Sequence, residues 1–179
     1  RMPLAGGAPR DLLPPVAEAD WSPDGKSLAV VRWADGAYRL EYPVGRLLYS
    51  AVSGMSNVRV SPRGDRVAFF DHPLVGDNRG SVMVVDVPGG EVHAISPGWA
   101  ALDGLAWNRD TGEIWFSGAR AGGNNAIYRI SPTGGKARLV YRAPGSVALH
   151  DVARGGRVLA AISDRGMRLV CRDVDGGNV

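Results

Sequence analysis

The sequence predicts an all-β protein, and the distribution of its turn residues is the main reason. The 179 residues include 25 glycines and 12 prolines, about a fifth of the chain against roughly 12% in an average protein. No stretch of fifteen residues lacks both, which excludes a helical bundle. Short apolar runs lie between these turn residues, as they do between the strands of a β protein. A hydrophobic fraction of 45% and a charged fraction of 22% are typical of a folded chain.

A turn motif recurs through the chain at nearly constant spacing. Each copy contains the end of one apolar strand, a tight turn and the start of another strand, at residues 21–30, 60–69, 107–116 and 152–159. A second marker has the same period: double glycines at 6–7, 89–90, 134–135 and 176–177, with the single Gly45 at the matching place in one unit. Two turn signals at one period indicate an internal repeat.

Four strands are expected in each repeat of about 40 to 45 residues, which is the blade of a β-propeller. Residues 66–70, 81–87 and 91–95 are predicted strands of one unit, and 113–117, 126–130 and 137–141 are their counterparts in the next. The strand before each turn completes the four. We therefore expect about four four-stranded blades that form part of a six- or seven-bladed ring.

The repeat phase places the unit boundaries on a single propeller segment. Residues 1–20 are expected to supply the final strand of a preceding blade, followed by units at 21–58, 59–104 and 105–150 and a partial unit at 151–179. Trp21, Trp107 and Trp115 are expected in the core between blades, and Trp99 in a loop.

Three arrangements of the ring remain open at this point. The chain is an incomplete propeller, or it closes alone as four blades, or two copies complete a larger ring. Exposed strand edges favour association, so we expect a homo-oligomer through open blade edges.

The charge pattern argues against nucleic acid as a partner. The net charge is +3, but the arginines are scattered and form no patch or stripe. The single Cys171 excludes an internal disulfide. No run approaches the roughly 18 apolar residues of a membrane span, so we expect no membrane contact by this segment.

The sequence predicts no catalytic residue, no cofactor and no metal site. His72, His93 and His150 are far apart and have no paired ligand beside them. No Gly-x-Ser-x-Gly nucleophile turn is present. Residues 173–178 have the outline of a calcium loop, but they lack its distal glutamate and fit the next hairpin turn better.

One end of the predicted sheets is the expected binding face. In a four-stranded blade, the loop between the second and third strands lies at the same end as the connection to the next blade. Binding residues concentrate on irregular loops that a rigid scaffold holds in place. The candidate residues on this long-loop face are His72, Asp77, Arg79, Trp99, Arg120, Asn124, Asn125 and His150.

Two stretches carry a resemblance to a known repeat family. Residues 21–26 (Trp-Ser-Pro-Asp-Gly-Lys) with the apolar 28–30, and residues 127–130 with the Gly-Gly turn and basic strand at 134–138, resemble TolB-like propeller repeats. The resemblance implies a propeller, related to WD-repeat folds, and it says very little about function.

A narrower resemblance concerns residues 3–10 with 19–25, and 71–73 with 80–82. These strings are similar to the propeller that follows the kinase domain and membrane helix of some bacterial serine/threonine protein kinases. That resemblance implies a sensor or interaction domain on the periplasmic or extracellular side of a membrane. No kinase motif is present in this chain, so any kinase activity would belong to a parent protein.

The leading functional hypothesis is a non-catalytic module that binds a protein, peptide or small ligand at the long-loop face. The first alternative is the gating propeller of a prolyl oligopeptidase-like peptidase, or a propeller hydrolase. The second alternative is a structural self-assembly unit.

Overall fold

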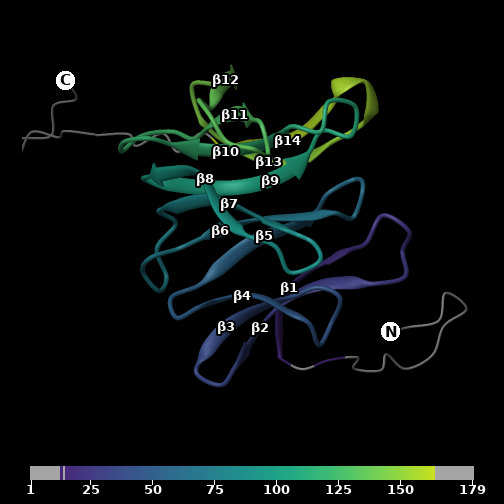
Figure 1. Cartoon of the computed structure of the whole chain (residues 1–179). Coiled ribbons are helices and arrows are strands. Elements are labelled where there is room, and N and C mark those ends of the chain that lie inside the picture. The colour runs from purple at the N-terminus through teal and green to yellow at the C-terminus, as the bar shows by residue number, and fades with distance from the viewer. Residues whose placement is uncertain (1–12, 14, 164–179) are drawn as a thin grey trace, which may run out of the picture.

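Four antiparallel sheets follow one another along the chain in the computed structural model, which describes residues 13 and 15–163. Figure 1 shows them stacked in chain order, like the blades of a fan. The first sheet contains Val16–Trp21 (β1), Leu28–Ala34 (β2), Ala37–Glu41 (β3) and Leu47–Ala51 (β4). The second contains Met55–Val60 (β5), Arg66–Asp71 (β6), Gly80–Asp86 (β7) and Val92–Trp99 (β8). The third contains Ala101–Trp107 (β9), Ile114–Ala119 (β10), Ala126–Ile130 (β11) and Arg138–Tyr141 (β12).

The fourth sheet has two described strands, Ser146–Val152 (β13) and Val158–Ser163 (β14), joined by a 3₁₀ turn at Arg154–Gly156. In every sheet each strand pairs with the next one in sequence, which is the topology of a propeller blade. The described part of the chain has no helix with the length and apolarity needed to cross a membrane. The all-β prediction and the predicted strands are confirmed.

The sheets begin four or five residues earlier than the repeat phase suggested, at residues 16, 55, 101 and 146. Val16–Trp21 pairs with Leu28–Ala34, so this strand belongs to the first sheet and not to a preceding blade. The reason is that the repeated turn joins the first two strands of one sheet, and the innermost strand precedes it. The glycine pairs at 6–7 and 176–177, the tail at 173–178 and Cys171 lie outside the described residues.

The repeated turn closes on its serine hydroxyl. Ser22 Oγ accepts a hydrogen bond from the Ser27 N–H at 2.8 Å and donates one to Asp24 at 2.6 Å. Ser61 repeats the arrangement in the second sheet, with the Arg66 N–H at 3.0 Å. Gly64 in this second turn has a φ of +73°, a conformation that favours glycine. The turn is therefore satisfied by its own residues.

Alternating side chains fill the seams between neighbouring sheets. On β6, Val67 and Phe69 pack against the first sheet, whereas Ala68 and Phe70 pack against the third. A third apolar cluster joins the third and fourth sheets around Leu149. The period-two pattern of the strands thus buries both faces of an inner blade.

Two of the three tryptophans expected in the core are there. Trp107 and Trp115 are 7% and 9% exposed and lie in seams between sheets. The prediction for Trp21 is wrong, because this side chain is 59% exposed on the outer face of the first sheet. The prediction for Trp99 is also wrong. It is the last residue of β8 and is 2% exposed.

The third and fourth sheets approach each other at Gly104. This residue has a φ of +78°, and a Cβ there would lie 1.9 Å from the carbonyl oxygen of Leu149. A side chain at this position is incompatible with the packing of β9 against β13.

Candidate functional site

The long connections meet at one end of the sheets, where short contacts hold them to one another. Arg120 Nη1 donates to the carbonyl of Pro97 at 2.7 Å. The Leu102 N–H donates to the carbonyl of Asn78 at 2.9 Å. We call this end the long-loop face.

His72 is part of the frame of this face. It is 9% exposed, and its Nε2 lies 2.7 Å from the Ser56 hydroxyl. Its Nδ1 lies 3.0 Å from the carbonyl of Arg79. Asp77 accepts the Arg79 N–H at 2.8 Å and also pairs with the Arg79 guanidinium at 2.8 Å. These three candidates therefore close the β6–β7 loop on itself.

Trp99 and Arg120 form a second group on the long-loop face. The guanidinium of Arg120 lies 3.9 Å from the centroid of the Trp99 ring, a cation–π contact. The Trp99 indole N–H donates to Ser96 Oγ at 3.0 Å. The ring also packs edge-on against Phe116 and Tyr128. Trp99 is therefore mainly a core residue.

The remaining candidates separate into two places. Asn124 donates to the carbonyl of Pro144, and the backbone of Asn125 bonds Ser146 and Val147, so both residues link the third sheet to the fourth. His150 is exposed in the middle of β13 and lines a hollow at the opposite end of the sheets. Seven of the eight candidates thus lie at the long-loop face, in three separate groups. His150 lies at the opposite end of the sheets.

The opposite end, which we call the turn face, is hollowed at several places between the described residues, of which we consider three. One, of about 680 Å³, lies where β1, β5, β9 and β13 end, and we call it the axial hollow. Its polar and aromatic lining includes Asp20, Trp21, Arg59, Trp107, Arg109, His150 and Asp151.

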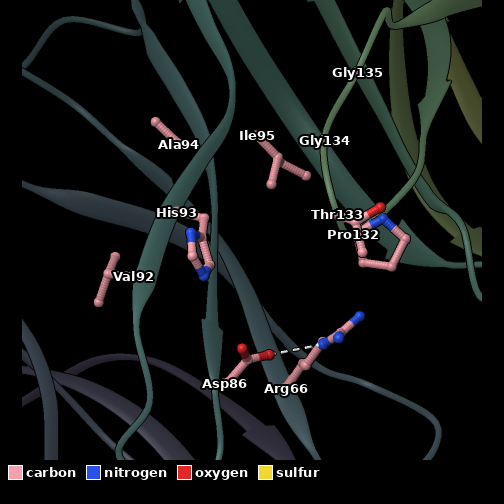
Figure 2. A pocket seen from close by; sticks show the side chains of 10 residues that line it. All are labelled: Arg66, Asp86, Val92, His93, Ala94, Ile95, Pro132, Thr133, Gly134 and Gly135. Carbon is pink, nitrogen blue, oxygen red and sulfur yellow. Dashed lines mark hydrogen bonds and ion pairs between the residues drawn. The ribbon is translucent and has the colours of Figure 1, made fainter.

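The other two hollows follow the seam between the second and third sheets. A middle hollow of about 330 Å³ shares Ser61, Pro62 and Arg109 with the axial one. An outer hollow of about 580 Å³ shares Arg66 and Pro132 with the middle one. Figure 2 shows the outer hollow between His93 on β8 and the turn at residues 132–135. Neighbouring hollows share lining residues, so the three lie in a row from the inner strands to the outer strand β8, and we call this row the seam groove.

Both arginines and aspartates line the seam groove, and they are unevenly paired. Arg66 pairs with Asp86 through Nε at 2.8 Å (Figure 2). Within the described ranges, Arg63 and Arg109 have no carboxylate within 4.0 Å. The nearby carboxylates are already bonded: Asp65 accepts the Ser61 hydroxyl at 2.7 Å, and Asp110 accepts the Gly155 N–H at 2.7 Å.

Two carboxyl groups elsewhere have shifted ionisation. Burial opposes ionisation of Glu41, but the Gly45 N–H and the Arg32 guanidinium outweigh it and hold the pKa of Glu41 below its ordinary value. Burial raises the pKa of Asp71, although a hydrogen bond from Tyr49 and the charge of His72 act against that rise. Neither carboxyl lines the seam groove.

The described residues offer no cluster of three histidine, cysteine or acidic side chains suited to a metal ion. The guanidinium groups of Arg63 and Arg109 and the main-chain groups of residues 132–135 at the turn face can contact the carboxylates and backbone of an extended chain.

The sequence reasoning missed the seam groove because it took the short turns as regular and inert. A signal was nevertheless present. The turn that carries Asp24 in the first repeat carries Arg63 in the second, and Arg109 stands in the third. Two arginines in neighbouring turns come close together once the sheets are known to be adjacent.

Comparisons with known proteins bear on the fold. No protein-family model matches the chain, and none of the curated proteins is similar to it in sequence. Among solved structures, a prolyl endopeptidase aligns over 82% of this chain and 26% of its own length, with 17% identity and a TM-score of 0.60. TolB from Acinetobacter baumannii aligns over 83% of this chain and 38% of its own length, with 13% identity and a TM-score of 0.50.

The fold is a β-propeller. The likeness to TolB supports the propeller fold that the repeat resemblance implied, while the kinase link is not shown. A TolB protein of Agrobacterium tumefaciens also aligns, over 89% of this chain and 77% of its own length, with 17% identity and a TM-score of 0.47. The propeller spans about a quarter of the prolyl endopeptidase and 38% of the A. baumannii TolB.

Proposed function

We propose that this propeller is a non-catalytic binding module whose seam groove holds an extended, acidic segment of a partner protein. The observation that carries the proposal is the row of three neighbouring hollows, with Arg63 and Arg109 on their walls and without an ion pair among the described residues. A row of hollows that runs from the inner strands to an outer strand suits an extended chain better than a compact small molecule.

Aspartates also line the groove, so the proposed acidic segment meets it at two arginines that have no ion pair among the described residues. Arg63 and Arg109 lie on turns that are already satisfied internally, so their guanidinium groups are available to a ligand. Guanidinium groups bind carboxylates in a bidentate manner, which favours a segment rich in aspartate or glutamate. Main-chain groups of the turn at residues 132–135 line the outer hollow and suit the backbone of such a segment.

The wider context proposed from the sequence remains a proposal. The resemblance to kinase-associated propellers supports a sensor module in a parent receptor-like kinase, outside the membrane. The long-loop face remains a predicted second binding surface for a protein, peptide or small ligand. Its candidate residues are largely engaged in internal contacts, and for that reason we rank the seam groove above it.

A gating role is the second candidate, and the likeness to a prolyl endopeptidase supports it. A gating propeller would act beside a peptidase domain, and free acidic peptides would then have no particular affinity for it. The same binding experiment therefore separates the two proposals.

The test is fluorescence anisotropy with labelled oligo-glutamate, compared with oligo-lysine and a neutral Gly-Ser peptide of equal length. We expect binding of oligo-glutamate that weakens as salt rises. The double variant Arg63→Glu/Arg109→Glu should weaken binding on the order of tenfold or more, because it reverses two charges in the groove.

Arg142→Glu is the matched control, since Arg142 is exposed on the β12–β13 connection and lies outside the groove. It should leave the affinity within a factor of about two. Equal binding of all three peptides, or an equal loss in the control, would overturn the proposal.

A further inference from the structure

Ser56 and His72 form a hydrogen-bonded pair at the long-loop end of the inner strand β5. Ser56 Oγ lies 2.7 Å from Nε2 of His72, and Nδ1 of His72 lies 3.0 Å from the carbonyl oxygen of Arg79. A carbonyl oxygen can only accept, so Nδ1 carries the ring hydrogen and donates it. In the neutral imidazole Nε2 is then the acceptor, and the Ser56 hydroxyl donates to it. The imidazole is therefore placed to take the serine proton.

The imidazole is held in this orientation from several sides. The backbone N–H of His72 donates at 3.0 Å to the carbonyl of Gly54, two residues before Ser56. The ring packs edge-on against Phe70, with 6.4 Å between ring centroids. Gly80 allows the loop to approach closely, because a Cβ there would lie 3.2 Å from Nδ1 of His72. Packing and hydrogen bonds thus fix the base before any ligand arrives.

The serine stands in an irregular stretch of its strand. The pairing of β5 with β6 shifts register between Ser56 and Arg59. Asn57, directly after Ser56, has a φ of +55°, which is uncommon for a residue with a side chain. Bulges and such backbone conformations concentrate at functional sites. Ser56 is also half-buried, whereas Ser22 and Ser61, which close their own turns, are 6% and 3% exposed. Ser56 is therefore more accessible than the serines that close a turn.

We propose that Ser56 is a nucleophile, activated by His72, that accepts the acyl group of a small carboxylic ester. A serine hydroxyl bonded to an imidazole that a third group orients is the arrangement that activates serine for acyl transfer. Oγ forms a bond to the carbonyl carbon while its proton passes to Nε2 of His72. The bond from that carbon to the alcohol oxygen then breaks, and the alcohol oxygen takes the proton from Nε2. The products are an acylated Ser56 and a free alcohol, so no further reactant is needed.

The proposal is independent of the seam groove, because the groove lies at the turn face and Ser56 at the opposite end of its strand. It concerns the transfer of one acyl group to the chain and requires no turnover. A failure of the acidic-peptide experiment would leave it untouched, and its own failure would leave the groove untouched.

Acetylation of the full chain by para-nitrophenyl acetate tests the proposal. Peptide mapping by mass spectrometry locates the acetyl group, and its increase with time gives the rate at each residue. We expect acetyl on Ser56 in the wild type and loss of this label in Ser56→Ala. His72→Gln should slow the acetylation of Ser56 by roughly 10²–10⁴-fold, the usual contribution of a general base. Far-ultraviolet circular dichroism should show that both variants are folded.

Ser53→Ala is the matched control, because Ser53 is also half-buried and lies on the β4–β5 connection, three residues before Ser56. It should leave the acetylation of Ser56 unchanged. Acetylation of the exposed Lys26 shows that the reagent has acted, so a sample labelled there but not at Ser56 would overturn the proposal. Equal rates of Ser56 acetylation in the wild type and a folded His72→Gln would also overturn it. The comparison of Ser56 with Ser53 in the wild type needs no variant to fold, and equal acetylation of the two serines would overturn the proposal as well.

Discussion

The long-loop face and the turn face of this propeller use their polar side chains in opposite ways. At the long-loop face, His72, Asp77 and Arg120 bond to backbone or to neighbouring side chains within the protein. At the turn face, Arg63 and Arg109 lie on closed turns without a carboxylate partner among the described residues. Irregular loop length is therefore a poor guide to which side chains are available to a ligand.

The difference has a simple physical origin. A long connection contains backbone groups that no sheet satisfies, and side chains must satisfy those that become buried. A short Ser-Pro-x-Gly turn is closed by its serine hydroxyl, as at Ser61. At the third position of the first turn Asp24 accepts from Ser22, whereas Arg63 at the same position of the second turn makes no ion pair among the described residues and is available for binding.

Trp99→Ala should have the largest effect on stability if the long-loop face is a structural frame. The ring is 2% exposed and packs on Phe116, with 4.9 Å between ring centroids. Truncation of a buried tryptophan leaves a cavity, so the free energy of unfolding should fall by about 3–5 kcal/mol. Urea denaturation measures this loss. The exposed Trp33→Ala is the control, and equal losses in the two variants would contradict the comparison.

His72→Ala should have the next largest effect. The imidazole is buried and bridges Ser56 and the Arg79 carbonyl, so its loss leaves buried polar groups without partners. The expected cost is about 1–3 kcal/mol, measured from the same urea transitions. His150→Ala, at an exposed position on the turn face, should cost less than about 0.5 kcal/mol. A stable His72→Ala protein would show that the β6–β7 loop holds its shape without this side chain.

The fold could be predicted in detail because the repeat is recognisable from its turn residues. The serine hydroxyls and glycines of the turns are local features, and residues 126–130 form β11 as expected. The surroundings of Trp21 could not be predicted in the same way, because burial depends on whether a neighbouring sheet is present. The roles of His72 and Trp99 depend on partners up to 29 residues away, such as Tyr128 beside Trp99. Sequence position alone does not reveal these contacts.

Arg120→Ala should have a smaller effect, because the guanidinium is exposed and covers one side of the Trp99 ring. An exposed cation–π contact is worth about 0.5–1 kcal/mol. Arg120→Lys should recover part of this loss, since lysine keeps the charge but not the planar stacking. Thermal unfolding measures both variants, with Arg142→Ala as the control. A fully stable Arg120→Ala protein would leave this arginine free for a ligand and weaken the distinction between the faces.

The smallest effects should appear in how folding stability depends on pH. Glu41 near the turn face and Asp71 near the long-loop face should change the stability in opposite directions as pH rises. The pKa of Glu41, beside the β3–β4 turn, is lowered in the fold, so its contribution to stability is present above the ordinary carboxyl pKa and is lost as pH falls through the lowered pKa. The pKa of Asp71, at the start of the β6–β7 loop, is raised by burial, so stability falls as pH rises from the ordinary to the raised pKa.

These slopes can be separated with two isosteric variants. Glu41→Gln should lower stability at neutral pH and flatten the loss on acidification, because it removes the ion pair with Arg32. Asp71→Asn should instead raise stability at neutral pH relative to mildly acidic pH, since it removes the cost of ionising a buried carboxyl, while its amide oxygen can still accept from Tyr49. Urea midpoints measured from about pH 3 to about pH 7 would record both changes across the carboxyl range. The two variants should change the pH dependence of the wild-type urea midpoint in opposite directions. Changes in the same direction would show that the neighbours of Asp71 offset its burial, and that the two faces do not differ in this respect.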